Sequence, residues 1–450
     1  MEKRKLVVAA ILFAAILSAA YAGGREEKSV SIPAGAQLVT ADRIGNPDAP
    51  ITLRYSVGLS YSHQASIPAR VEYLTKASTE WAKAHPNVKL ILEIQSGSLD
   101  QVLQKMMQQI SSNTAPDFAM IDGMYVPLFY KHLSPIDAYV NKDEVADYFD
   151  WTRDTMIDKQ DGKLKSLWFT TGGAGLWYRK DLISTPPKTW DEWIAAGNQL
   201  KAQGYKDGMI AWGAMNEQIV YGNVLPMFYG LGGNLVDATG KPIFGVGSDR
   251  DKMIEVFNFW LRAVKEGLVS QRIIDIKADG DMAADASKPN QVAMILANNL
   301  FISQLKSVIG KDAGNWAFTF IPQKTAEAKG QVAGGWNWGF FTKDPARLKA
   351  AVDFVQTVYT SKEGMAGWCY AGGYTPTRKS VLSTPQFATD EYQKSFAKVV
   401  EVARTRPGVK SYNVMTVNLQ SAWQAVILGK QTPSQAVEDA YKRTMDQISD

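Results

Sequence analysis

Residues 51–123 read ITLRYSVGLSYSHQASIPARVEYLTKASTEWAKAHPNVKLILEIQSGSLDQVLQKMMQQISSNTAPDFAMIDG. Short apolar runs in this stretch predict three strands: 51–57, 88–94 and 117–121. Between them, apolar residues three or four positions apart predict helices over 68–84 and 99–110. This alternation with short connections predicts an α/β fold with a parallel sheet and right-handed crossovers. Ligands of such sheets bind beyond the carboxyl ends of the strands, so residues 58–63 and 122–125 are the first candidates for a site.

The chain continues as a mixture of strands and helices. Residues 168–180, WFTTGGAGLWYRK, are predicted to be a flexible Thr/Gly segment that enters a new strand. Thr189 is a predicted helix N-cap, and Glu192 three residues later completes a capping box. Further strands are expected at 291–296 and 316–322, and the last hundred residues are predicted to be largely helical.

The first 22 residues have the three regions of a secretory signal peptide. A basic KRK at 3–5 precedes an apolar run over 6–20, and AYA at 20–22 fits the small-x-small pattern of a cleavage site. The alternative is an uncleaved anchor, but the run is short for a span of about 20 residues. No cysteine lies near the site, which argues against a lipoprotein. We expect cleavage near Ala22 and a periplasmic or extracellular protein.

The composition excludes several classes of protein. The 450 residues are 46% hydrophobic and 21% charged, which is typical of globular chains and excludes disorder, collagen and coiled coil as the main state. A formal net charge of +4 gives no reason to expect a nucleic-acid partner. A single cysteine excludes an internal disulfide, and three histidines argue against a histidine-based metal centre. No cofactor and no metal are therefore expected.

Three segments approach catalytic motifs, but none is complete. GLSYS at 58–62 lacks the second glycine of a nucleophile elbow. GGAG at 172–175 lacks the Lys-Ser/Thr of a phosphate loop and precedes a strand. Cys369 has no histidine nearby, so we expect a small buried residue and not a nucleophile. A carboxylate pair of the glycosidase type remains open, because Asp and Glu are plentiful.

Aromatic residues gather where loops are expected, and the chain has 13 Trp and 18 Tyr. An aromatic face can cover the apolar face of a sugar ring, while a few polar side chains bond its hydroxyls. Trp336 and Tyr374 stand beside glycines at predicted element ends, so we expect them in a cleft. Other tryptophans have helical spacing and are predicted to fill the core: Trp81, Trp190, Trp193, Trp260 and Trp423.

Seven segments in order then carry a resemblance: 117–126 (DFAMIDGMYV), 170–181 (TTGGAGLWYRKD), 186–193 (PPKTWDEW), 292–299 (VAMILANN), 334–336 (GGW), 372–378 (GGYTPTR) and 406–412 (RPGVKSY). Together they resemble the family 1 extracellular solute-binding proteins, the carbohydrate-binding components of ABC importers. The resemblance covers nearly the whole chain after the signal peptide.

The resemblance implies the two-lobed α/β fold of periplasmic binding proteins, a Venus flytrap with a hinge between its lobes. The solute would lie between the lobes, which close on it. The implied crossings lie near residues 170–173, 313 and 360. The implied lobes are 23–170 plus 314–359 for the N-terminal lobe, and 171–313 plus 360–450 for the C-terminal lobe.

The resemblance also implies ligand contacts at twelve positions: Ser60, Tyr61, His63, Asp122, Tyr125, Thr171, Trp212, Asn298, Gly335, Trp336, Tyr374 and Arg406. Arg406 would partner an acidic sugar, a phosphate or a pair of ring hydroxyls, and its structural alternative is an arginine that bonds strand-end carbonyls. Asp122 would bond sugar hydroxyls, or else form a turn before Gly123.

These features together predict a secreted, monomeric binding protein that takes a sugar or sugar-like solute to the permease of an ABC importer. No enzymatic activity is expected. The alternative is a secreted carbohydrate-active hydrolase or lyase that uses carboxylates. A binding protein leaves its ligand unchanged, whereas an enzyme converts it.

Overall fold

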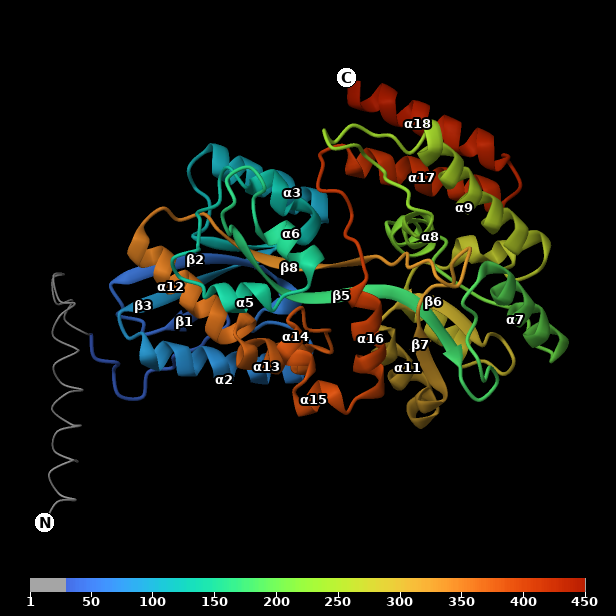
Figure 1. The fold of residues 1–450 in the computed structure, drawn as a ribbon. Coiled ribbons are helices and arrows are strands. Elements are labelled where there is room, and N and C mark those ends of the chain that lie inside the picture. The colour runs from blue at the N-terminus through green and yellow to red at the C-terminus, as the bar shows by residue number, and fades with distance from the viewer. Residues whose placement is uncertain (1–29, 450) are drawn as a thin grey trace, which may run out of the picture.

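The computed structural model describes residues 30–449, so the predicted signal peptide over 1–22 lies outside the described residues. Two α/β lobes lie side by side, and one long strand runs from the first lobe into the second (Figure 1). Within the described residues, no helix is both long and apolar enough to cross a bilayer. The two-lobed fold agrees with the expectation from the sequence.

The first lobe contains the unit predicted over 51–123. Its elements are β2 (Ile51–Gly58), α2 (Pro68–Ala84), β3 (Val88–Gln95), α3 (Leu99–Ser111) and β4 (Phe118–Asp122). β2 pairs in parallel with β3 on one side and with β4 on the other. Right-handed crossovers that leave in opposite directions place α2 and α3 on opposite faces of the sheet, as Figure 1 shows. The predicted parallel unit is therefore confirmed.

Further elements complete the first lobe. β1 (Arg43–Gly45) adds an antiparallel edge to β3. The helices around this sheet are α4 (Val126–Phe129), α5 (Lys142–Ala146), α6 (Asp150–Met156), α12 (Pro345–Val355), α13 (Lys362–Gly372), α14 (Lys379–Leu382) and α15 (Pro385–Ala388). The apolar sides of α5, α6, α12, α13, α14 and α15 share one hydrophobic core with α2. Val126 and Phe129 of α4 belong to the other core.

The second lobe is mainly helical. Its elements are α7 (Trp190–Ala202), α8 (Leu225–Gly230), α9 (Gly247–Lys265), α10 (Asp279–Ala286), β6 (Met294–Asn298), α11 (Phe301–Ile309), β7 (Trp316–Thr319), α17 (Tyr412–Ile427) and α18 (Pro433–Ser449). The predicted capping box begins α7: the Thr189 hydroxyl accepts from Glu192 N at 3.2 Å, and Glu192 Oε2 accepts from Thr189 N at 3.1 Å. The tryptophans predicted for the core are all buried.

Two long strands join the lobes. β5 (Ser166–Arg179) pairs antiparallel with β8 (Ala333–Phe340), and its far end pairs with β6 and β7. The complete sheet has the order β1-β3-β2-β4-β8-β5-β6, with β7 also on β5. The new strand predicted within 168–180 is confirmed, but it begins earlier than expected, because β5 already includes the Thr/Gly residues. Pairing to β8 overrides the weak strand preference of its glycines.

The chain passes between two hydrophobic cores within β5. Residues 167–169 lie in the first core, and Ala174, Leu176 and Trp177 lie in the second. β7 belongs with the second core and pairs with the end of β5, whereas Trp368 of α13 lies in the first core. We therefore propose that the second crossing is the connection from β7 to β8, and not residue 313.

The third crossing follows α16 (Glu391–Glu401), whose side chains reach both cores: Phe396 and Val399 the second, Val400 the first. Figure 1 shows α16 between the two lobes. We therefore propose that the last crossing lies after α16 and not near residue 360, because α13, α14 and α15 still pack on the first lobe.

Candidate functional site: a cleft between the lobes

A cleft of about 370 Å³ lies where the two lobes meet. It adjoins the carboxyl ends of β2 and β4, neighbouring strands whose crossovers leave in opposite directions, and this is where α/β sheets bind ligands. Its lining residues are Tyr61, Leu99, Asp122, Thr170, Thr171, Gly172, Glu217, Gln218, Tyr221, Asn298, Asn299, Leu300, Gly334, Gly335, Trp336, Tyr374 and Arg406. A hollow of about 410 Å³ on the outside of α7 is slightly larger, but it touches neither strand end.

One side of the cleft is aromatic. The ring of Tyr61 stacks on that of Tyr374 at 5.7 Å between centroids, and it meets Trp336 at the same distance. The guanidinium of Arg70 lies over the Tyr374 ring at 4.7 Å and donates to the carbonyl oxygens of Ser60 and Gly372. These contacts fix the loop after β2 against the loop after α13. The result is a rigid apolar surface that can cover the face of a ring.

The cleft is also lined by amides and hydroxyls on β5, β6 and the residues after β6. Asn298 donates to Asp279 Oδ2 at 3.1 Å, and its Oδ1 accepts from Leu300 N at 2.8 Å. Asn299 Oδ1 accepts from Gly173 N at 3.1 Å, and the Thr171 hydroxyl donates to Gly334 O at 2.7 Å. These side chains are therefore held in place before any ligand arrives, which lowers the entropic cost of binding.

Three charged groups meet in the cleft. Asp122 comes from the end of β4, Glu217 from the loop before a π-helical turn at 219–224, and Arg406 from the segment before α17. Arg406 Nη2 lies 3.2 Å from both oxygens of Asp122, and its Nη1 lies 3.6 Å from Glu217 Oε1. The alternative for Arg406 was a structural arginine that bonds strand-end carbonyls. It is not observed, because the partners of Arg406 are the carboxylates of Asp122 and Glu217.

Burial and neighbouring charges shift the pKa values of Glu217 and Arg406. The Glu217 side chain is 28% exposed, and desolvation raises the pKa of its carboxyl, against the lowering effect of Arg406. Burial disfavours the charge on Arg406, but Asp122, Tyr412 and Glu217 outweigh it, so its pKa is raised and the guanidinium stays charged. Tyr412 and Thr416 of α17 both donate to the Glu217 carboxylate.

Eight of the twelve predicted contacts line the cleft: Tyr61, Asp122, Thr171, Asn298, Gly335, Trp336, Tyr374 and Arg406. Three of the others do not line it. Ser60 offers its carbonyl to Arg70, His63 Nε2 bonds the Ser78 hydroxyl at 3.2 Å, and the Tyr125 hydroxyl donates to Asn413. Burial lowers the pKa of His63.

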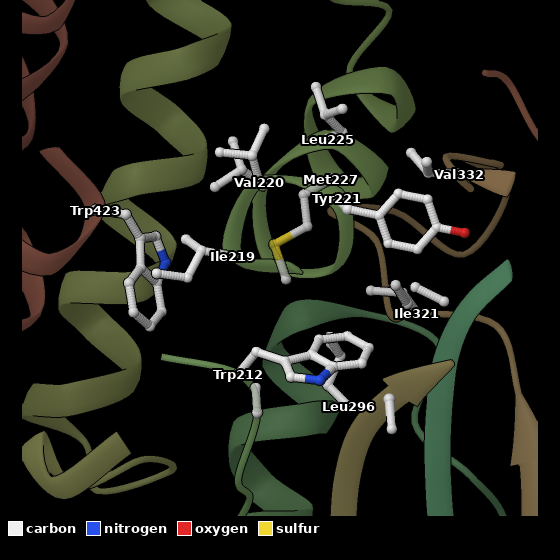
Figure 2. Close-up of a cluster of buried hydrophobic side chains, with 14 of the residues drawn as sticks. Trp212, Ile219, Val220, Tyr221, Leu225, Met227, Leu296, Ile321, Val332 and Trp423 are labelled. Carbon is white, nitrogen blue, oxygen red and sulfur yellow. The ribbon is translucent and has the colours of Figure 1, made fainter. Parts of the chain in front are cut away.

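The prediction for Trp212 is wrong. Its side chain is 1% exposed, and its Nε1 donates to Asp279 Oδ1 at 2.8 Å. Figure 2 shows its ring below Met227 and beside Leu296, inside the second core. The apolar run Met209–Ile210–Ala211 before Trp212 indicates burial, and the prediction of a ligand contact did not take it into account.

Sequence reasoning missed several residues of the cleft: Leu99, Thr170, Gly172, Glu217, Gln218, Tyr221, Asn299, Leu300 and Gly334. Four of them, Thr170, Gly172, Asn299 and Gly334, adjoin a predicted contact in the chain and could have been found by extension. Glu217 and Tyr221 had no such signal, because their approach to Arg406 depends on how the second lobe packs.

The only cysteine of the chain, Cys369, is buried, and its thiol donates to Phe169 O at 3.7 Å. Burial raises the pKa of this thiol, which disfavours the reactive thiolate. The expectation of a small buried residue is confirmed. Over residues 30–449, no group of three or more His, Cys, Asp or Glu side chains is arranged as a metal site.

The sequence profile described as "Bacterial extracellular solute-binding protein" matches residues 76–394. The chain belongs to this family. Family members bind solutes outside the cytoplasm, and this agrees with a cleft between two lobes.

Two curated relatives of the solute-binding protein match most of its length. It is 21% identical over 383 residues to a maltotriose-binding protein of Pyrococcus abyssi. The alignment covers 85% of this chain and 80% of the relative. It is 24% identical over 353 residues to a galactooligosaccharide-binding protein of Bacillus subtilis. The alignment covers 75% of this chain and 78% of the relative.

Solved structures share the fold. The sugar-binding protein MalE of Xanthomonas citri aligns with a TM-score of 0.72 at 18% identity, over 88% of this chain and 97% of that one. The cyclic α-maltosyl-1,6-maltose binding protein of Arthrobacter globiformis aligns with a TM-score of 0.71 at 16% identity, over 88% of this chain and 98% of that one. At these identities the likeness concerns the fold alone.

Proposed function

We propose that this solute-binding protein captures a carbohydrate in the cleft between its lobes and delivers it to the permease of an ABC importer. The observation that carries the proposal is that an aromatic surface, formed by Tyr61, Trp336 and Tyr374, and fixed polar groups line the same cleft. Aromatic faces match the C–H face of a sugar, and amides match its hydroxyls. The named ligands of the two curated relatives are of the same chemical kind.

Binding without catalysis fits the state of the cleft carboxylates. Asp122 is held by Met124 N and Arg406, and Glu217 by Tyr412 and Thr416. A general acid or nucleophile must be able to reach the scissile bond, and these groups already have partners. We further propose that the protein is a monomer, exported through the segment 1–22 and active outside the cytoplasm.

The test is a thermal-shift screen of the chain from Gly23 against neutral and acidic sugars, oligosaccharides and polyols, followed by mass spectrometry of the recovered ligand. A ligand at 100 times its dissociation constant should add about 2.7 kcal/mol to the free energy of unfolding, a rise in Tm of a few degrees. Recovery of intact ligand supports the proposal. Consumption of the ligand would support a carbohydrate-active enzyme instead, and no shift with any sugar would reject a carbohydrate ligand.

A further inference from the structure

We propose that the cleft selects uncharged, polyhydroxylated solutes and rejects their carboxylate and phosphate counterparts, because two carboxylates already neutralise its cation. This inference rests on the proposed function and deepens it. Among the described residues that line the cleft, Arg406 is the one cation, and Asp122 and Glu217 are the anions. The question is therefore whether Arg406 is available to an anionic ligand.

Asp122 holds Arg406 from the first lobe. Both Asp122 oxygens lie 3.2 Å from Arg406 Nη2. Asp122 cannot easily turn away, because its Oδ1 also accepts from Met124 N at 3.0 Å and caps the turn after β4. Each of the two side chains is only 9% exposed. A buried ion pair of this kind is costly to break, since the partner left behind stays charged and desolvated.

Glu217 faces the same guanidinium from the second lobe. Its Oε1 lies 3.6 Å from Arg406 Nη1, and Tyr412 and Thr416 hold its two oxygens in place. With both carboxylates ionised, the three groups sum to a charge of −1. Burial raises the pKa of Glu217, and its protonation would bring the sum to zero. In neither state does the cleft present a net positive charge.

Arg70, a second arginine beside the cleft, is also engaged. Its two terminal nitrogens donate to Ser60 O and Gly372 O, and its plane lies over Tyr374. Arg70 is 8% exposed, so it supports the aromatic side from behind and offers its charge to backbone carbonyls. The Nε atoms of Arg406 and Arg70 have no hydrogen-bond partner among the described residues, so the obstacle to an anionic group is the pair of fixed carboxylates beside Arg406.

A hydroxyl group does not meet this obstacle. It can accept from Arg406 Nη1, which is 3.6 Å from Glu217, and donate to a carboxylate oxygen of the same cluster. Hydroxyls can therefore hydrogen-bond to the ion pair without breaking it. An anionic solute would be repelled by the two carboxylates, whereas a neutral solute would not.

The experiment measures affinities by calorimetry at pH 7.5 for matched pairs: glucose with glucuronate and glucose 6-phosphate, galactose with galacturonate, and maltose with maltobionate. For any pair that binds, the acidic member is expected to bind at least about ten-fold more weakly. Equal or tighter binding of an acidic member would overturn the inference and leave the proposed function intact. Absence of binding by all members of the panel and of the wider screen would reject the carbohydrate proposal, and the inference with it.

The variant Asp122→Asn tests the cause. It keeps the shape and the bond from Met124 N but frees Arg406 from one carboxylate, so the ratio of neutral to acidic affinity should fall by at least about five-fold. Asp251→Asn on α9, where the carboxylate is 76% exposed and does not line the cleft, should leave the ratio unchanged. If Asp122→Asn does not fold, Glu217→Gln serves in its place. A folded variant with an unchanged ratio would overturn the inference.

Discussion

Trp336 stands on β8 with its ring 5.7 Å from that of Tyr61, and both rings line the cleft. Trp336 is partly exposed, so its ring is available to a ligand. Replacement of Trp336 by Ala should weaken sugar binding about ten-fold or more, since stacked aromatic contacts add about 0.5–1.5 kcal/mol beyond the area they bury. Calorimetry with the best ligand of the screen measures the loss.

The control for Trp336→Ala is Tyr370→Ala. Tyr370 is 66% exposed on α13 and does not line the cleft, so its loss should leave the affinity unchanged. A Trp336→Ala protein that binds as tightly as the natural chain would show that the aromatic side does not contact the ligand.

Glu217 gives a prediction about pH. Its pKa is raised by burial, so its protonated form adds stability that is fully present below about pH 4.5 and is lost as pH rises through the raised pKa. Asp122 adds to the rise, and Arg406, Thr416 and Tyr412 oppose it. The Tm of the natural protein minus that of Glu217→Gln should therefore fall between pH 5 and pH 8, as measured by scanning calorimetry.

A second variant, Glu391→Gln, serves as the control for this pH dependence. The pKa of Glu391 on α16 is lowered by Lys394, so its contribution is lost as pH falls and not as it rises. The Tm difference for Glu391→Gln should be flat between pH 5 and pH 8 and should shrink only as pH falls below about 4.5. A Glu217→Gln difference that grows with pH would contradict the argument from burial.

At the scale of elements, the pairing of β5 with β8 carries the crossing between the lobes. A Cβ at Gly335 would lie 2.0 Å from Thr170 O and 2.8 Å from Trp168 Nε1, two atoms that already bond each other. Gly335→Ala should therefore destabilise the protein by about 1–3 kcal/mol, the usual cost of overpacking. Chemical denaturation measures this loss.

Gly280 in α10 provides the matched glycine, because a Cβ there would meet nothing within 4 Å. Gly280→Ala should be neutral or stabilising by up to about 1 kcal/mol, since alanine favours helices. A Gly335→Ala protein as stable as the natural chain would mean that the two strands can separate locally without loss.

At the scale of the whole molecule, ligand binding should bring the lobes together. The cleft residues come from both lobes, so a sugar that contacts both sides binds the closed state more tightly, and that difference is all that can drive closure. Small-angle X-ray scattering should show a smaller radius of gyration when the best ligand is present. Trp336→Ala at the same ligand concentration should show a weaker decrease, and an unchanged radius for the natural protein would contradict closure.

Local pattern was sufficient for most elements. The strands and helices over 51–123, the capping box at Thr189 and the burial of Trp193 and Trp423 all follow from spacing within about ten residues. The start of the strand within 168–180 was misplaced, because its first residues are stabilised by β8, which lies more than 150 residues later in the chain. Pairing partners at that distance leave no trace in local periodicity.

The residues alone indicated the parallel α/β unit, and the resemblance supplied the two-lobed fold and eight of the lining residues of the cleft. Tertiary structure decided the rest. It buried Trp212 and brought Asp122, Glu217 and Arg406 together from three distant segments. The reason is physical: periodicity records which side of an element is buried, but the charge of a cleft depends on which side chains meet there, and that is fixed only when the two lobes pack.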